Sequence, residues 1–204
     1  TAGRDQEAHD WIIEGFAKTI DNLPGIAWRL AEQLIDMAKR EKQHSNVASV
    51  LALKFFYRPD TALYRELEKA AKRIRCWPAV RQALLAYLET GVRPDLQPTK
   101  KHKASIPPSN WPLPPCDLLL PTSQMAANLF PNTDVLTNVA IYEKRPDDVL
   151  KWYHLGKKGR LYHDTDNSVA EAVKSTHTDE ALAIWKGMAE REIARVKPAA
   201  YKVA

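Results

Sequence analysis

Apolar residues recur every three or four positions over the first 91 residues, and short breaks interrupt this pattern. The breaks fall at Leu23-Pro24-Gly25, before Val47, at Arg58-Pro59 and before Val80. Such spacing places the apolar side chains on one face of an α-helix. The pattern therefore predicts five helices between about Gln6 and Gly91, joined by short turns as antiparallel neighbours are.

The same periodicity returns after residue 133 and continues to the end of the chain. It predicts four further helices, around Leu136–Tyr142, Val149–Tyr153, Val169–Val173 and Ala181–Ala194. Pro198 is expected to begin a last helix, which the end of the chain cuts short. Leu161 and Tyr162, between the second and third of these four helices, are expected to form a short extended piece.

Residues 92–133 carry no sustained period and separate the two helical regions. Nine of the 14 prolines lie here, and the other five precede or begin predicted helices. Proline removes a backbone donor and fixes φ, so a helix or a central strand is excluded. We expect the basic run at residues 99–103 to be mobile. The later part is apolar and is expected to lie against the helices, as at Trp111, Leu113, Leu118, Leu119, Leu120, Leu129 and Phe130.

Three segments share one turn pattern without gaps: Arg58–Leu63, Arg145–Leu150 and His177–Leu182. Each follows a short predicted helix and begins another, and its aspartate is suited to the positive end of the second helix. This arrangement is typical of tetratricopeptide-like repeats. We therefore predict an all-α fold of repeated αα-hairpins, either an α-solenoid or an irregular helical bundle. The predicted organisation is N-terminal hairpins (1–91), a proline-rich connection (92–133) and C-terminal hairpins (134–204).

Composition narrows the class of protein. The 204 residues include only 7 glycines and 2 cysteines, so a turn-rich β fold and a disulfide framework are disfavoured. No apolar run reaches the length of a membrane helix, and the first residues do not resemble a signal peptide. We expect a cytoplasmic fragment of a longer protein without a membrane association, because the chain begins at Thr1 and ends within a predicted helix.

No motif for catalysis, metal binding or nucleotide binding is present. Cys76 and Cys116 are far apart in sequence, the six histidines are scattered, and no glycine-rich phosphate loop exists. Cys76 is interpreted as a small half-buried residue, although a helix N-terminus would lower the pKa of its thiol. We expect no enzymatic activity, no catalytic residue and no cofactor or metal in this chain.

The net charge of +5 is concentrated in residues 51–91 and 135–163. Lys69, Lys72, Arg73 and Arg75 follow one another at a predicted helix end, and Lys100, Lys101 and Lys103 form a basic run in the connection. These side chains are candidate phosphate contacts for nucleic acid. The simpler interpretation is that cations in a last helical turn favour the helix dipole.

Aromatic residues gather near the predicted turns. Packing between hairpins explains most of them. Tyr57, Tyr64 and Tyr153 are the candidates for a concave groove that binds a peptide, as in helical repeats. The sequence does not assign the face on which they lie.

Seven segments are similar in sequence to one known family: Leu23–Ala27, Phe55–Pro59, Trp77–Arg81, Tyr87–Gly91, Trp111–Pro114, Ile141–Asp148 and Asp179–Trp185. On these segments the chain resembles the C-terminal helical region of bacterial SWIM zinc finger proteins. The family's finger contains Cys-x-Cys and Cys-x-His pairs, and neither pair occurs here. The resemblance implies a helical scaffold within a larger protein whose finger binds zinc outside this chain, with DNA or protein as the finger's target.

Together these features predict a non-catalytic helical-repeat scaffold that binds a protein or peptide. The alternative is a nucleic-acid-binding accessory domain that uses the basic helix ends and the loop from Lys100 to Lys103.

Overall fold

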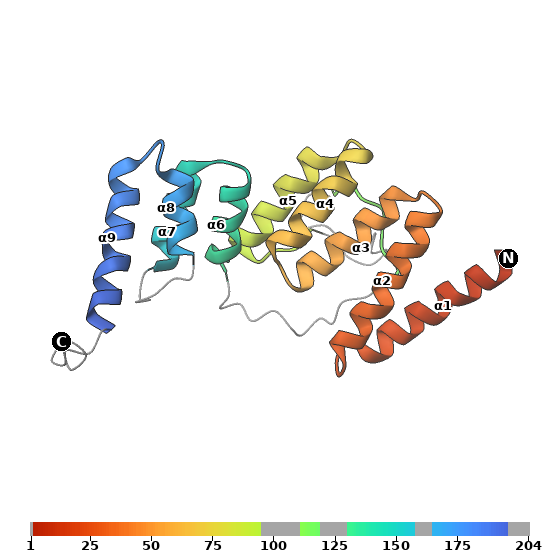
Figure 1. The fold of residues 1–204 in the computed structure, drawn as a ribbon. Helices are drawn as coiled ribbons and strands as arrows, with labels where there is room; N and C mark the ends of the chain where they lie inside the picture. Colours follow the sequence, from red (N-terminus) through yellow and green to blue (C-terminus); the bar gives the residue numbers. More distant parts are fainter. Residues whose placement is uncertain (1, 95–110, 119–129, 158–164, 196–204) are drawn as a thin grey trace. The chain divides into compact units, whose positions relative to one another are not determined.

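The computed structural model describes residues 2–94, 111–118, 130–157 and 165–195, with side chains described from Gln6 onward. The regular structure of these residues is entirely α-helical, which confirms the all-α class for this part of the chain (Figure 1). The segment around Leu161 and the helix expected at Pro198 lie outside the described residues. The helices are α1 (Ala2–Thr19), α2 (Pro24–Arg40), α3 (His44–Tyr57), α4 (Thr61–Arg73), α5 (Trp77–Thr90), α6 (Thr133–Tyr142), α7 (Pro146–Lys157), α8 (Asp166–Val173) and α9 (Thr178–Arg195).

The chain divides into two compact units. Unit 1 comprises Thr1–Pro131, and unit 2 comprises Asn132–Ala204. In unit 1, α1 pairs with α2 and α3 pairs with α4, and α5 follows; in unit 2, α6 pairs with α7 and α8 pairs with α9. The described residues of the proline-rich connection, apart from its last two, therefore belong to unit 1.

Helix α3 is the centre of unit 1. Its side chains are buried on nearly every side, as at Val47, Leu51, Phe55 and Phe56. A helix that is apolar all round must be covered by neighbours. Helices α2 and α4 both pack directly on α3 and supply this cover. Both present an apolar stripe to α3, including Ala31 and Leu34 from α2 and Leu67 and Ala71 from α4.

Three interhelical turns share one geometry. Lys42, Arg75 and Lys144 follow α2, α4 and α6 with φ values of 58°, 58° and 57°. The next residue in each case donates its N–H to the carbonyl of an alanine five positions earlier, at 2.8–3.1 Å. This is the Schellman motif, in which glycine is the usual left-handed residue. A residue with a Cβ costs roughly 1 kcal/mol there.

The proline-rich segment 111–118 covers one face of α3. The rings of Trp111 and Phe56 have centroids 5.6 Å apart, and Leu113 and Leu118 are buried. Ser49 on α3 donates its hydroxyl to the carbonyl of Pro114 at 2.8 Å. The segment thus completes the core of unit 1 beside α5, whose Tyr87 hydroxyl donates to the carbonyl of Phe56 at 2.7 Å.

Gly91, where the fifth helix was predicted to end, follows α5 in the left-handed conformation, with φ of 75°. Its N–H donates to the carbonyl of Tyr87 at 2.8 Å. A Cβ at this position would lie 2.6 Å from Cδ2 of Phe130. Glycine is therefore required both by the backbone conformation and by the ring that packs on it.

Unit 2 has its own core around α8. Ala140, Val149, Val169, Val173 and Ala181 are all completely buried there. The buried Asp166 at the start of α8 accepts a hydrogen bond from the Tyr153 hydroxyl at 2.8 Å and pairs with Arg191 on α9. This polar network fixes α8 between α7 and α9.

The repeated turn pattern has two different local structures. Asp60 caps α4 by accepting the N–H of Leu63 at 2.8 Å. Asp147 and Asp179 lie instead within the first turns of α7 and α9. Pro146 begins α7, whereas Pro59 precedes the capping residue and lies outside the helix.

Candidate interaction groove and basic helix ends

A groove of about 1010 Å³ follows the length of α2 in unit 1. Residues Gly25, Trp28, Glu32, Asp36 and Lys39 line it from α2. Their spacing of three or four positions places them on one helical face. Helix α3 contributes Leu51, Lys54 and Tyr57, and α4 contributes Ala62, Leu63 and Glu66.

An aromatic pair forms part of the groove wall. The rings of Trp28 and Tyr57 have centroids 5.1 Å apart, and Phe16 packs edge-on against the other side of Trp28 at 5.3 Å. Tyr57 is half-buried, so part of its ring faces the groove. The indole Nε1 of Trp28 is covered and has no hydrogen-bond acceptor among the described residues. Buried donors without an acceptor are rare in native proteins.

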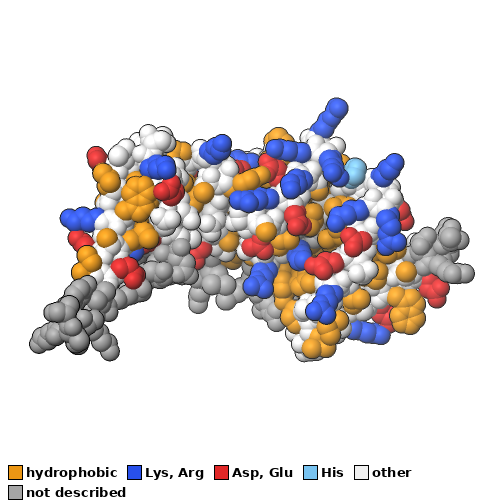
Figure 2. Space-filling view, in the orientation of Figure 1, with side chains coloured by type: hydrophobic (Ala, Val, Ile, Leu, Met, Phe, Trp, Pro, Cys, Tyr) orange, Lys and Arg blue, Asp and Glu red, His pale blue; other side chains and the backbone are white. Residues whose placement is uncertain are grey.

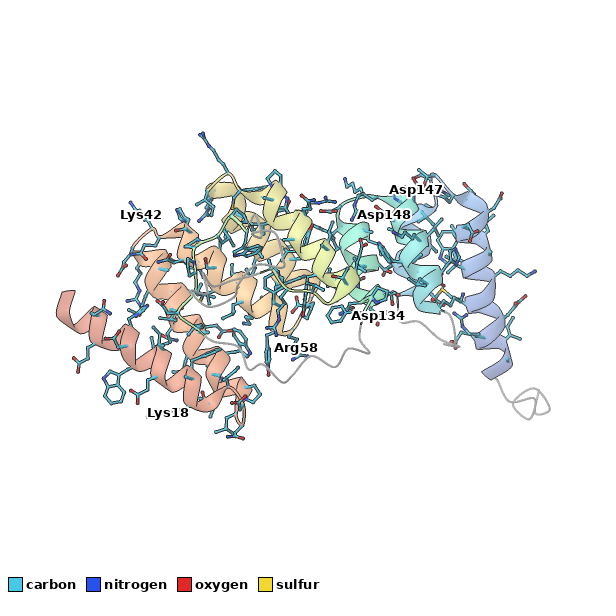
Figure 3. All side chains as sticks on the ribbon, turned by 180° about the vertical axis from the view of Figure 1, so that it is seen from behind. Lys18, Lys42, Arg58, Asp134, Asp147 and Asp148 are labelled. Carbon is cyan, nitrogen blue, oxygen red and sulfur yellow. The ribbon has the colours of Figure 1, made fainter. Side chains whose placement is uncertain are left out.

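The charged residues of the groove largely neutralise one another. Lys54 Nζ lies 2.8 Å from Glu32 Oε1, and Lys39 Nζ lies 3.4 Å from Asp36 Oδ1. Arg58 is exposed at the end of α3 opposite to Lys42 (Figure 3). The lining therefore offers hydrogen-bonding groups of both signs without a strong net field.

Two of the three tyrosines predicted for a groove cannot serve there. Tyr64 is completely buried between Phe55 and Trp77, and Tyr153 is 1% exposed. Burial, followed by the hydrogen bond to Asp166, raises the pKa of the Tyr153 hydroxyl well above its usual value. Both tyrosines are core residues, because they occupy inward-facing positions of their hairpins, where an aromatic ring packs against apolar neighbours. Only Tyr57 lies in the groove.

The basic residues predicted on α4 are exposed. Lys69, Lys72, Arg73 and Arg75 all lie at its end, and Lys72 Nζ is 2.8 Å from Glu68 Oε1. Lys and Arg side chains gather over this end of unit 1 and over the adjacent end of α2 (Figure 2). Lys100, Lys101 and Lys103 lie outside the described residues.

The sequence interpretation missed Trp28, Gly25 and Lys42. Trp28 and Gly25 share the spacing of the α2 groove face, and this pattern could have indicated a second, half-polar helix face. A Cβ added to Gly25 would meet no heavy atom within 4 Å, so open space adjoins it. The left-handed backbone of Lys42 could not be predicted from the sequence, because lysine rarely adopts this conformation.

A second cavity of about 450 Å³ lies between α1, α2, α3 and the segment 111–118. It contains His9, Cys116 and Asp117, with His9 Nε2 3.8 Å from Asp117 Oδ2. Burial raises the pKa of the Cys116 thiol to about 11, so the reactive thiolate is disfavoured. Burial also raises the pKa of Cys76, which agrees with the interpretation of Cys76 as a small half-buried residue and not with a thiol activated by a helix N-terminus.

Within the described ranges, no cluster of three or more His, Cys, Asp and Glu side chains has a geometry suited to a metal ion. In the same part of the chain, none of the helices has the combination of length and apolar composition that crossing a bilayer requires. Comparisons with protein-family models, curated proteins and solved structures find no match to this chain.

Proposed function

We propose that this chain is a non-catalytic helical scaffold that binds an extended segment of a partner protein in the α2–α3–α4 groove. The scaffold is a degenerate tetratricopeptide-like repeat within a larger, cytoplasmic SWIM zinc finger-like protein. Zinc belongs to the finger of that parent and not to this chain.

The observation that carries the proposal is the groove wall formed by Trp28 and Tyr57. Tyr57 is half-buried and Trp28 is largely buried beside the groove, and Tyr and Trp are among the residues that most often dominate binding energy in protein interfaces. An extended peptide also supplies backbone carbonyls, the kind of acceptor that the covered Nε1–H of Trp28 lacks among the described residues. Because the lining is nearly neutral, it favours binding through aromatic contacts and hydrogen bonds over binding through the attraction of a net charge.

The turns support the repeat interpretation. The same Schellman motif follows α2 and α4, between the hairpins of unit 1, and α6, within a hairpin of unit 2, so one turn geometry is used in both units. In unit 2 the two turns that share the sequence pattern are adjacent, with His177 Nε2 3.1 Å from Asp147 Oδ1. Neighbouring hairpins in a repeat protein make such contacts between equivalent turns.

The test is selection of binding peptides from a displayed random library with the intact chain as bait, followed by affinity measurement for each selected peptide. Tyr57→Ala is expected to weaken binding at least about tenfold, which corresponds to about 1.4 kcal/mol. Gly25→Leu should do the same by filling the groove, since nothing obstructs a side chain there.

Gly187→Leu is the matched control, because it adds the same side chain to another helix in unit 2, where a Cβ would make only ordinary contact at 3.7 Å. Equal binding by Tyr57→Ala, Gly25→Leu and the unmodified chain would refute the groove assignment. Because the groove lining is nearly neutral, the affinity should change little between low and moderate salt.

A further inference from the structure

The turns that follow α2 and α4 lie at the same end of unit 1, since the chain reverses direction at each turn. Residues 39–42 and 69–75 together form what we call the basic edge. They contain seven basic side chains, all exposed, and one acidic side chain, Glu41. Figure 2 shows the Lys and Arg side chains gathered over this region, and Figure 3 shows Lys42 extending from it.

Neighbouring carboxylates neutralise only a small part of this charge. Lys39 pairs with Asp36 and Lys72 pairs with Glu68. The other five cations of the basic edge make no ion pair with a carboxylate in the described part of the chain. The turn of unit 2 that shares this backbone geometry differs, because two carboxylates near Lys144, those of Glu143 and Asp148, both pair with Arg145.

Helix dipoles do not account for this accumulation. The C-termini of α2 and α4 lie at this end together with the N-termini of α3 and α5. Neither of these N-termini has a capping side chain or an acidic residue in its first turn. Opposite partial charges therefore meet at this end and largely cancel. Lys42 and Arg75 moreover lie beyond the helices, in left-handed turn positions that glycine would occupy more easily.

The side chains of the basic edge indicate which class of partner it can bind. Apart from Glu41, its exposed side chains are Lys and Arg, and the large exposed apolar side chains of unit 1 lie elsewhere, at Trp11, Leu23, Ile26 and Val92. A membrane surface would require apolar insertion for stable binding, and a single strand would require aromatic stacking. Cations without either feature match the regularly spaced phosphates of a duplex.

We propose that the basic edge binds the phosphate backbone of a nucleic-acid duplex without reading its sequence. This inference goes beyond the proposed peptide groove and can be tested apart from it, because Lys39 is the one cation of the basic edge that also lines the groove and neither Lys42 nor Arg75 does so. A scaffold with both surfaces would hold a protein segment and a duplex at once.

The experiment measures fluorescence anisotropy of a labelled random-sequence DNA duplex with the intact chain across a range of salt concentrations. The unmodified chain should lose affinity steeply as salt rises. The double variant Lys42→Gly/Arg75→Gly should bind at least about tenfold more weakly at low salt. Its log–log salt slope should be smaller by about two, since two phosphate contacts are removed.

Glycine is chosen because it suits the left-handed conformation, so the variant retains its fold while losing two cations. Lys144→Gly makes the same substitution at the left-handed turn position of unit 2 and is expected to bind like the unmodified chain. The proposal is overturned by equal binding of the double variant, or by an absence of binding at low salt. Equal affinity for polyglutamate or for vesicles containing phosphatidylserine would overturn the assignment to nucleic acid.

Discussion

Single residues in this chain depart from their ordinary preferences in ways that can be measured. Lys144 has φ of 57°, where a Cβ is crowded by the following carbonyl. Lys144→Gly should therefore raise the free energy of unfolding of unit 2 by up to about 1 kcal/mol, measured by urea denaturation. Lys144→Ala keeps the Cβ and should give no gain. Equal effects of the two substitutions would show that the lysine side chain, and not its backbone conformation, limits stability.

Burial also alters the titration of a single side chain, that of Tyr87. Its ring is completely buried, and desolvation raises the pKa of its hydroxyl to about 12, partly opposed by Arg93. In the unfolded chain the hydroxyl titrates near pH 10. The buried, neutral hydroxyl of Tyr87 therefore makes its full contribution to the free energy of unfolding below pH 10. Between pH 10 and about 12 the free energy of unfolding falls by roughly 2–3 kcal/mol as this contribution is lost.

Denaturant titrations over this pH range test the effect against Tyr87→Phe. The variant loses the hydrogen bond to Phe56 and should be about 1 kcal/mol less stable at neutral pH. It should also lose less stability between pH 10 and 12 than the unmodified chain. A parallel decline of both proteins would exclude Tyr87 as the titrating group.

At the scale of elements, the proline-rich segment is an integral part of a helical core. Leu118 is 2% exposed, so Leu118→Ala should lower the free energy of unfolding of unit 1 by about 2–5 kcal/mol. Pro112→Ala, at an exposed position of the same segment, should have a small effect. Urea denaturation measures both. Equal stability of Leu118→Ala and Pro112→Ala would show that the segment contributes little to the core.

The helices themselves were predictable, because apolar spacing, prolines at helix starts and Gly91 are local signals. The burial of Tyr64 and Tyr153 was not, since aromatic residues suit a core and a groove equally well. The position of Trp28 and Gly25 in the groove was also not predicted, because the groove itself forms only when α2 and α4 pack on α3. The sequence located the basic residues of α4, but their proximity to Lys42 follows from the antiparallel arrangement of helices.

At the scale of the whole molecule, each unit buries its own apolar residues, and this separation has a thermodynamic consequence. Val149 is completely buried in the core of unit 2, and Leu67 is completely buried in that of unit 1. If the units unfold independently, each substitution should affect only its own unit, because each cavity weakens the packing of one core. Val149→Ala should accelerate hydrogen exchange in α6–α9, and Leu67→Ala in α1–α5, as measured by mass spectrometry. Acceleration across both units from either substitution would show that the chain unfolds as one cooperative body.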